Sequence, residues 1–197
     1  MSLMLRITQV TGIYYLFQKK FFQMMLLPFA TKGQISLEEA IFLAELTREA
    51  RGEGPIVEVG TLFGSSTKVI LLNKAPQQPL LAVDIFNWNP AHLTPEQHYR
   101  VTTLGLQAFA GDASGLRIVK IDKNEFYRTY KGPTPALVFL DADHSYEETR
   151  KDIEWAKMSG APIICGHDYS ETWPGVMKAV DEAGRASKIC GSLWRLN

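Results

Sequence analysis

The chain has 197 residues, a length typical of one ordinary domain with a sizeable buried core. Its residues are 46% hydrophobic and 21% charged, which is a globular composition and excludes a disordered or fibrous chain. The 21 basic and 21 acidic side chains balance, which argues against a general nucleic-acid-binding face. The two cysteines, Cys165 and Cys190, are too few for a disulfide framework or a Cys-rich zinc site, and they favour a cytoplasmic protein.

The N-terminal segment, residues 1–34, is predicted to form a helical extension that acts as a lid or as an oligomer contact. Its longest apolar stretch, residues 21–30, is interrupted by Gln23 and Pro28. A membrane span needs about 20 mostly apolar residues, so this stretch is too short to cross a bilayer. We therefore expect no membrane association, and we expect any homo-oligomer to form through these helices.

Residues 35–197 are predicted to form one unit of alternating strands and helices. The unit begins with a helix, because Ser36 and Glu39 form a capping box and Gly52 ends the pattern after residue 51. Short apolar runs predict strands at residues 56–59, 80–85, 116–121, 136–140, 162–165 and 188–196. Helix-length stretches lie between them at residues 65–73, 95–109, 124–130, 146–158 and 175–183. This alternation predicts an α/β fold with a Rossmann-like, doubly wound, mostly parallel sheet.

Ligands of such sheets bind beyond the carboxyl ends of the strands, where the first strand is followed by a glycine-containing loop. Residues 58–67 read Glu-Val-Gly-Thr-Leu-Phe-Gly-Ser-Ser-Thr, so Gly60 permits a tight turn and the next helix offers free N–H groups. A dinucleotide fingerprint would place glycines at positions 58, 60 and 63, but Glu58 and Phe63 stand at two of them. A carboxylate at Glu58 would repel a pyrophosphate and suits a ligand with an ammonium group, so hydride transfer ranks second.

Polar residues also end the second and third strands. Asp84 lies 24 residues after Gly60, where an acid commonly accepts hydrogen bonds from ribose hydroxyls, although a plain turn residue also fits there. The third strand is followed by Asp122, Lys123 and Asn124. Asp122 is interpreted either as a contact of an adenine or as the cap of the following helix.

The fourth and fifth strands are each followed by acids and a histidine. Asp141, Asp143 and His144 follow the fourth strand, and His167 and Asp168 follow the fifth. Because these strands are expected to be neighbours, the five side chains are predicted to converge at one edge of the sheet. Carboxylates hold hard cations such as Mg²⁺, and an imidazole widens the choice to manganese, iron or zinc. Two carboxylates can also divide the work, so that one binds metal or substrate and the other accepts a proton.

Together these residues resemble class I S-adenosylmethionine (SAM)-dependent methyltransferases. They are most similar to the small-molecule O-methyltransferase branch, which includes macrolide and aminocoumarin sugar methyltransferases and has the cephalosporin hydroxylase proteins as relatives. The resemblance covers residues 35–197. It rests on residues 58–67, Asp84, the Asp-Ala-Asp-His-Ser-Tyr block at 141–146 with Asp152, and residues 166–169 and 174–180. It implies a SAM-binding methyltransferase domain that moves a methyl group to a hydroxyl of a small-molecule acceptor.

The resemblance also implies the site residues. It places the cofactor against Glu58, Gly60, Thr61, Gly64, Ser65, Ser66, Asp84, Asp122, Lys123 and Asp141. It assigns a divalent metal, Mg²⁺ or Mn²⁺, to Asp141, His167 and Asp168, and the general base to Asp143. His144, next to Asp143, is a second candidate for the proton acceptor. His167 departs from the pattern, because metal-dependent members have an acid at this position, so reactions with and without a metal both stay open.

Three other classes of function remain as alternatives. A nicotinamide-dependent oxidoreductase shares the fold but is disfavoured by Glu58. A nucleic-acid methyltransferase shares the cofactor but is disfavoured by the zero net charge and by the residues after the fourth strand. A non-catalytic SAM-binding protein, or different metal chemistry on the same scaffold, is the third, because fold does not fix function.

Overall fold

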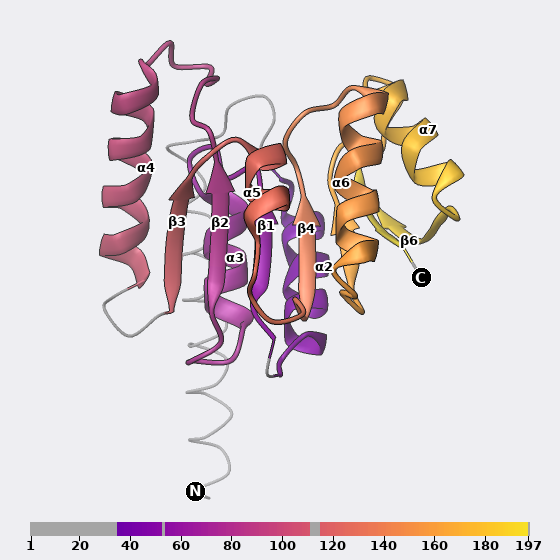
Figure 1. Ribbon diagram of the computed structural model, residues 1–197, viewed down its shortest axis with the longest axis horizontal. Coiled ribbons are helices and arrows are strands. Elements are labelled where there is room, and N and C mark those ends of the chain that lie inside the picture. The colour runs from indigo at the N-terminus through magenta and orange to yellow at the C-terminus, as the bar shows by residue number, and fades with distance from the viewer. Residues whose placement is uncertain (1–34, 53, 111–114, 197) are drawn as a thin grey trace, which may run out of the picture. The chain divides into compact units, whose positions relative to one another are not determined.

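The computed structural model describes residues 35–52, 54–110 and 115–196. The predicted helical extension at residues 1–34 lies outside the described residues. The described elements follow one another in the order drawn in Figure 1: α2 (Leu37–Glu49), β1 (Ile56–Val59), α3 (Ser65–Asn73), β2 (Leu80–Asp84), α4 (Pro95–Ala110), β3 (Leu116–Lys120), α5 (Lys123–Thr129), β4 (Leu137–Leu140), α6 (Tyr146–Met158), β5 (Ile164–Gly166), α7 (Pro174–Glu182), β6 (Ala186–Cys190) and β7 (Leu193–Leu196).

The strands form one mixed sheet in the order β3-β2-β1-β4-β5-β7-β6. The pairs β1–β2, β2–β3, β1–β4 and β4–β5 are parallel, whereas β7 runs antiparallel to both β5 and β6. Every residue of β1, β4 and β5 is buried, which is why these strands stand out in the sequence as unbroken apolar runs. The α/β, mostly parallel sheet predicted from the sequence is confirmed.

Helices cover both faces of the sheet. In Figure 1, α5 and α6 stand in front of the strands, and α2 and α3 lie behind them. The rear helices contact each other in the pairs α2–α3 and α3–α4, and α6 packs on α7. Between the sheet and the front helices lies an apolar core that includes Val57, Val138, Ile153, Val180 and Trp194. The order of the strands brings the carboxyl ends of β2, β1, β4 and β5 side by side at one edge, where ligands of such sheets bind.

The run at residues 188–196 was predicted as one strand, and this prediction is wrong. The chain forms a hairpin there, with β6 and β7 paired antiparallel on either side of Gly191. Gly191 has a φ of +60°, and a Cβ at this position would lie 2.5 Å from Oε1 of Glu39. A glycine is therefore needed both for the turn and for its close approach to α2. The other predicted boundaries differ from the observed ones by at most two residues.

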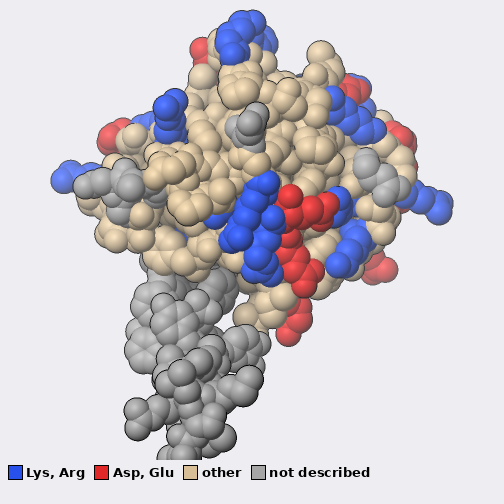
Figure 2. Space-filling model, turned by 90° about the horizontal axis from the view of Figure 1, so that it is seen from below, with Lys and Arg blue, Asp and Glu red and all other residues tan. Residues whose placement is uncertain are grey.

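Two findings concern the exterior of the described part. No helix among the described residues combines the length and the apolar character needed to cross a membrane. On the face seen in Figure 2, which lies away from the carboxyl ends of the strands, basic and acidic side chains stand next to one another. This mixture agrees with the balanced charge of the sequence.

Candidate functional site

The loop between β1 and α3 owes its shape to two glycines. Gly60 has a φ of +94°, and a Cβ here would lie 1.8 Å from the carbonyl oxygen of Asp141 at the end of β4. The neighbour that excludes a side chain at Gly60 is therefore the adjacent strand. Gly64 has a φ of +81°, and its Cβ would lie 2.6 Å from the side chain of Leu106 in α4. Ser65 and Ser66 then begin α3.

Asp84 holds this loop from the side of β2. One carboxylate oxygen accepts hydrogen bonds from the backbone N–H groups of Thr61 (2.8 Å) and Leu62 (2.9 Å). The other oxygen accepts one from the N–H of Phe86 at 2.6 Å. The predicted ribose acid thus already organises the loop after β1. An ionised carboxylate offers about four acceptor positions, so one remains for a further donor.

Helix α4 holds the same loop from the opposite side. The carbonyl oxygen of Leu62 accepts hydrogen bonds from Nε2 of His98 (2.9 Å) and from the hydroxyl of Thr102 (2.8 Å). Leu62 has a φ of +47°, a conformation that costs energy in a bulky residue and persists only where its surroundings hold it. The sequence analysis missed His98 and Thr102. Their spacing of four residues, which places them on one face of a helix, was the only signal for them.

Two polar side chains of β1 and its loop are buried. The hydroxyl of Thr61 is buried and has no hydrogen-bond partner in the described structure, and the residue is 2% exposed. Glu58 is fully buried, and its two oxygens accept hydrogen bonds from the hydroxyls of Ser66 and Thr67, each at 2.5 Å. Burial raises the pKa of Glu58 to about 8, although both hydrogen bonds act in the opposite direction. Glu58 therefore fixes the first turn of α3 from within the core.

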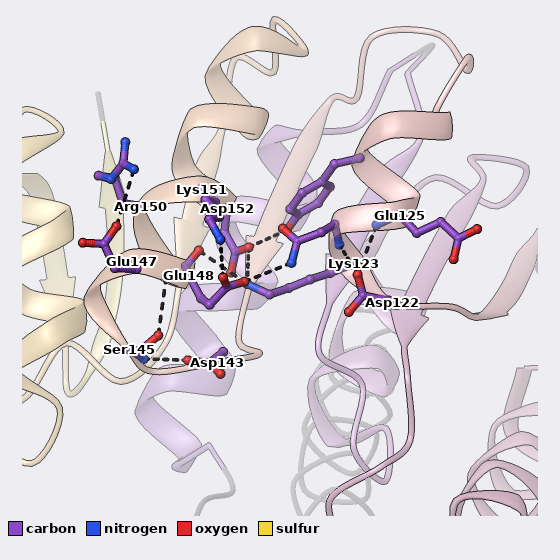
Figure 3. A network of polar contacts seen from close by, with 12 residues as sticks. Asp122, Lys123, Glu125, Asp143, Ser145, Glu147, Glu148, Arg150, Lys151 and Asp152 are labelled. Carbon is purple, nitrogen blue, oxygen red and sulfur yellow. Dashed lines mark hydrogen bonds and ion pairs between the residues drawn. The ribbon is translucent and has the colours of Figure 1, made fainter.

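Asp122 and Lys123 lie at the start of α5, and Lys123 connects this helix to α6. The Asp122 side chain accepts from two backbone N–H groups of the first turn of α5, so it caps that helix. Nζ of Lys123 lies 2.5 Å from Oδ1 of Asp152 and 3.2 Å from Oε2 of Glu148, both on α6 (Figure 3). The capping interpretation of Asp122 is confirmed, and contact of Asp122 and Lys123 with an adenine stays a prediction.

The acids and histidines after β4 and β5 converge as predicted. Donor atoms of Asp141, His167 and Asp168 all lie within 4.8 Å of one another. Asp168 has a φ of +62°, which turns the chain directly after β5. A cavity of about 10 Å³, roughly the space of one water molecule, is lined in part by Asp141, Asp143 and His167.

His144 lies just before α6 and contacts the acids of this group. Its Nε2 lies 2.8 Å from Oδ2 of Asp168 and 3.7 Å from Oδ1 of Asp141, although it makes no well-aligned hydrogen bond. Burial lowers the pKa of His144, but the two carboxylates outweigh it and raise the pKa to about 9. The indole of Trp173, which is 39% exposed, packs on the imidazole with the ring centroids 4.2 Å apart.

His167 is likewise held as a cation by its surroundings. Its burial lowers the pKa, but Asp168, Glu39 and Asp141 together raise it to about 10. Burial raises the pKa of Asp168, but His144 and His167 together keep it well below its usual range. Nδ1 of His167 is buried, lies 3.5 Å from Oδ1 of Asp168 and has no hydrogen-bond partner among the described residues. A divalent cation at this place would supply the positive charge that protons on His144 and His167 otherwise provide. The residues therefore fit a metal ion.

Asp143 occupies a more exposed place than the other acids. Its Oδ1 accepts a hydrogen bond from the backbone N–H of Ser145 at 2.8 Å (Figure 3). Hydrogen bonds from Ser145 lower the pKa of Asp143, so the carboxylate is ionised at neutral pH.

Glu39, which the sequence analysis read only as half of a capping box, also reaches this site. Its Oε2 accepts from the N–H of Ser36 at 2.6 Å, which confirms the capping box. Its Oε1 accepts from the N–H of Ser192 at 2.7 Å and lies 3.4 Å from Nε2 of His167. Ser192 is 153 residues further along the chain, and no local pattern could indicate this second contact.

Neither a protein-family model nor a curated protein matches the chain. Solved structures do match, among them the cofactor-bound protein Rv0187 from MTB, with 22% identity and a TM-score of 0.61 over 77% of this chain and 69% of that one. An O-methyltransferase from Bacillus cereus in complex with SAH is 17% identical, with a TM-score of 0.63 over 90% and 86% of the two chains.

A SAM-dependent O-methyltransferase from Thermotoga maritima also matches, at 12% identity with a TM-score of 0.59. The match covers 80% of this chain but only 54% of that protein's length. At such identities the likeness establishes a common architecture. The chain has the Rossmann-like fold seen in these O-methyltransferase structures.

Proposed function

We propose that the protein transfers a methyl group from SAM to a hydroxyl of a small-molecule acceptor, with a divalent cation at the acidic edge. The observation that carries the proposal is the loop at residues 60–64, which Asp84 and α4 hold from two sides. The Thr61 hydroxyl in this loop is buried without a hydrogen-bond partner in the part of the chain that the structure describes. A buried hydroxyl without a partner costs about 1–3 kcal/mol, which a polar ligand at this strand end would recover. Structures of the same fold with O-methyltransferase activity in their names add support.

SAM supplies an activated methyl group on a sulfonium, so the protein must bind it, align the acceptor and accept a proton. The loop after β1 and the first turn of α3 are proposed to bind the methionine end, with Thr61 as a polar contact. Asp84 has one acceptor position free for a ribose hydroxyl. Alignment of donor and acceptor alone can contribute about 7–11 kcal/mol to lowering the barrier.

The acceptor is proposed to bind beside the metal-binding residues at the ends of β4 and β5. A divalent cation held there by Asp141, His167 and Asp168 would lower the pKa of the acceptor hydroxyl and position it. Trp173 offers an exposed ring edge beside His144 for an apolar part of the acceptor. The identity of the metal, Mg²⁺ or Mn²⁺, is part of the same proposal.

Two residues are proposed as proton acceptors, and the directions of their pKa shifts favour Asp143. Asp143 is ionised and borders the same cavity as Asp141, so it can take a proton at once. His144 has a pKa of about 9 beside its two carboxylates, so it must lose a proton before it can accept one. Asp143 is therefore the proposed proton acceptor, with His144 as the alternative.

The experiment is a methyl-transfer assay with labelled SAM and a panel of hydroxylated small molecules, with product masses as the readout. Transfer to a hydroxyl is expected, and it should fall about 100-fold or more in Asp143→Asn and on removal of metal with EDTA. Glu147→Gln, an exposed acid four residues away, is the matched control. Transfer that survives Asp143→Asn, His144→Ala and EDTA together would contradict this mechanism.

A further inference from the structure

Glu39 lies outside the cavity but contacts the far side of the His167 ring. It is 6% exposed and belongs to α2. Glu39 lies near Nε2 of His167, whereas Asp168 lies near Nδ1 of the same ring. Ser192, in the turn between β6 and β7, lies between the two side chains. Its hydroxyl is 2.9 Å from Oε1 of Glu39 and 3.0 Å from Nε2 of His167.

The donors and acceptors of Glu39, Ser192 and His167 decide which group donates in each hydrogen bond between them. Both oxygens of Glu39 accept from backbone N–H groups, those of Ser36 and Ser192, which suits an ionised carboxylate that can only accept. Ser192 therefore gives its single hydroxyl hydrogen to Glu39. The hydroxyl oxygen can then only accept at its other contact, so Nε2 of His167 must carry a hydrogen and donate it.

This assignment fixes which ring nitrogen is available to a ligand. In the neutral imidazole the lone pair must then reside on Nδ1, because Nε2 holds the hydrogen. Nδ1 is the buried atom without a hydrogen-bond partner that lies beside Asp168. Histidines that bind metals characteristically donate their other ring N–H to a carboxylate or another acceptor, which sets the tautomer and the ring orientation.

We infer that Glu39, acting through Ser192, is a positioning residue that presents Nδ1 of His167 to a divalent cation held with Asp141 and Asp168. The inference rests on the metal-binding part of the proposed function. It gives a reason for the closeness of the β6–β7 turn to α2, where Gly191 leaves no room for a Cβ. It also predicts that one ligand is nitrogen, so Mn²⁺ and Zn²⁺ should bind more tightly than Mg²⁺.

The first measurement is a titration of the full chain with Mn²⁺ alone, in which free Mn²⁺ is followed by electron paramagnetic resonance. Ser192→Ala and Glu39→Gln are expected to weaken Mn²⁺ binding by about 10- to 100-fold, the usual effect of losing such an outer contact. Ser192→Thr keeps the hydroxyl and should restore binding. Glu38→Gln removes an exposed charge from the same helical turn and should leave binding unchanged.

The second measurement reports the ring itself. In Zn²⁺-loaded, ¹⁵N-histidine-labelled protein, two-bond ¹H–¹⁵N correlations should show His167 with its hydrogen on Nε2. Thermal unfolding of each variant confirms that the variant is folded. A hydrogen on Nδ1, or unchanged Mn²⁺ affinity in folded Ser192→Ala, would overturn the inference. Failure of the wild type to bind Mn²⁺ or Zn²⁺ would overturn it as well. Binding of S-adenosylhomocysteine, measured on the same preparation, shows separately whether the methyl-transfer proposal stands.

Discussion

At the scale of single residues, the sheet edge beyond β1 contains side chains whose burial works against stability. Thr61 leaves a hydroxyl without a partner inside the protein, and Glu58 places a carboxyl in the core. Such arrangements cost folding free energy and are common where a site is prepared for a ligand. Both residues can be tested by substitutions that preserve their shape.

Thr61→Val removes the unpartnered hydroxyl and keeps the volume. Its free energy of unfolding should be about 1 kcal/mol higher than that of the wild type, because the substitution removes a buried polar group that has no partner. It should also bind S-adenosylhomocysteine about tenfold more weakly, because one polar contact is lost. Urea unfolding and calorimetry measure the two effects.

Thr103→Val is the matched control, since the Thr103 hydroxyl is also buried and unpartnered but belongs to α4. It should share the stabilisation and leave the affinity for S-adenosylhomocysteine unchanged. Equal affinity of wild type and Thr61→Val would remove Thr61 from the cofactor site.

Glu58 predicts a specific dependence of stability on pH. Its pKa is about 8 in the folded chain and 4.5 as the reference value, so the folded state binds the extra proton between these two pH values. Its contribution to stability is therefore complete below about pH 4.5 and is lost as the pH rises toward 8.

Between pH 6 and pH 9 the wild type should lose about 2–3 kcal/mol of unfolding free energy through this group, and Glu58→Gln should not. Urea unfolding at the two pH values measures the difference, and Glu171→Gln, an exposed acid, serves as the control. The same pH dependence in Glu58→Gln as in the wild type would show that Glu58 is ionised in the folded chain at pH 6.

At the scale of elements, α5 and α6 are joined by an ion pair between Lys123 and Asp152. Asp152 is 2% exposed and also accepts a hydrogen bond from the hydroxyl of Tyr127 at 2.9 Å. Burial raises the pKa of Asp152 to about 6 despite the nearby ammonium group. The pair therefore secures the packing of two helices beside the predicted adenine position.

Lys123→Met should lower the free energy of unfolding by about 3 kcal/mol, since a buried acid loses its partner. Its affinity for S-adenosylhomocysteine should stay within about twofold of the wild type if the lysine acts only between the helices. Lys151→Met, which breaks an exposed pair with Glu148, should cost less than about 1 kcal/mol. A large loss of affinity with little loss of stability would instead place Lys123 against the cofactor.

The elements were predicted well where local pattern decides them. Fully buried strands appear as unbroken apolar runs, and Ser36 with Glu39 marks a helix start that the structure contains. The hairpin of β6 and β7 was missed because apolar residues continue on both sides of Gly191, and the adjacent Gly-Ser pair was the only turn signal.

At the scale of the whole molecule, the topology made the site predictable and long-range contacts limited the prediction. Parallel strands in the order β2-β1-β4-β5 bring Asp84, Asp141 and Asp168 to one edge, which follows from the alternation of strands and helices. The contacts of His98 with Leu62 and of Glu39 with His167 join segments far apart in the chain. Spacing in the sequence does not specify these partners, because the contacts depend on how α4 and α2 pack on the sheet.

The central claim is that the edge beyond β1 and β2 binds the adenosyl cofactor of a methyltransferase. Calorimetric titration of the purified chain with S-adenosylhomocysteine, beside NADH and beside Asp84→Ala, tests it most directly. The account predicts saturable binding of S-adenosylhomocysteine, weaker binding in Asp84→Ala and no binding of NADH. Binding of NADH, or binding of neither compound, would contradict the proposed function.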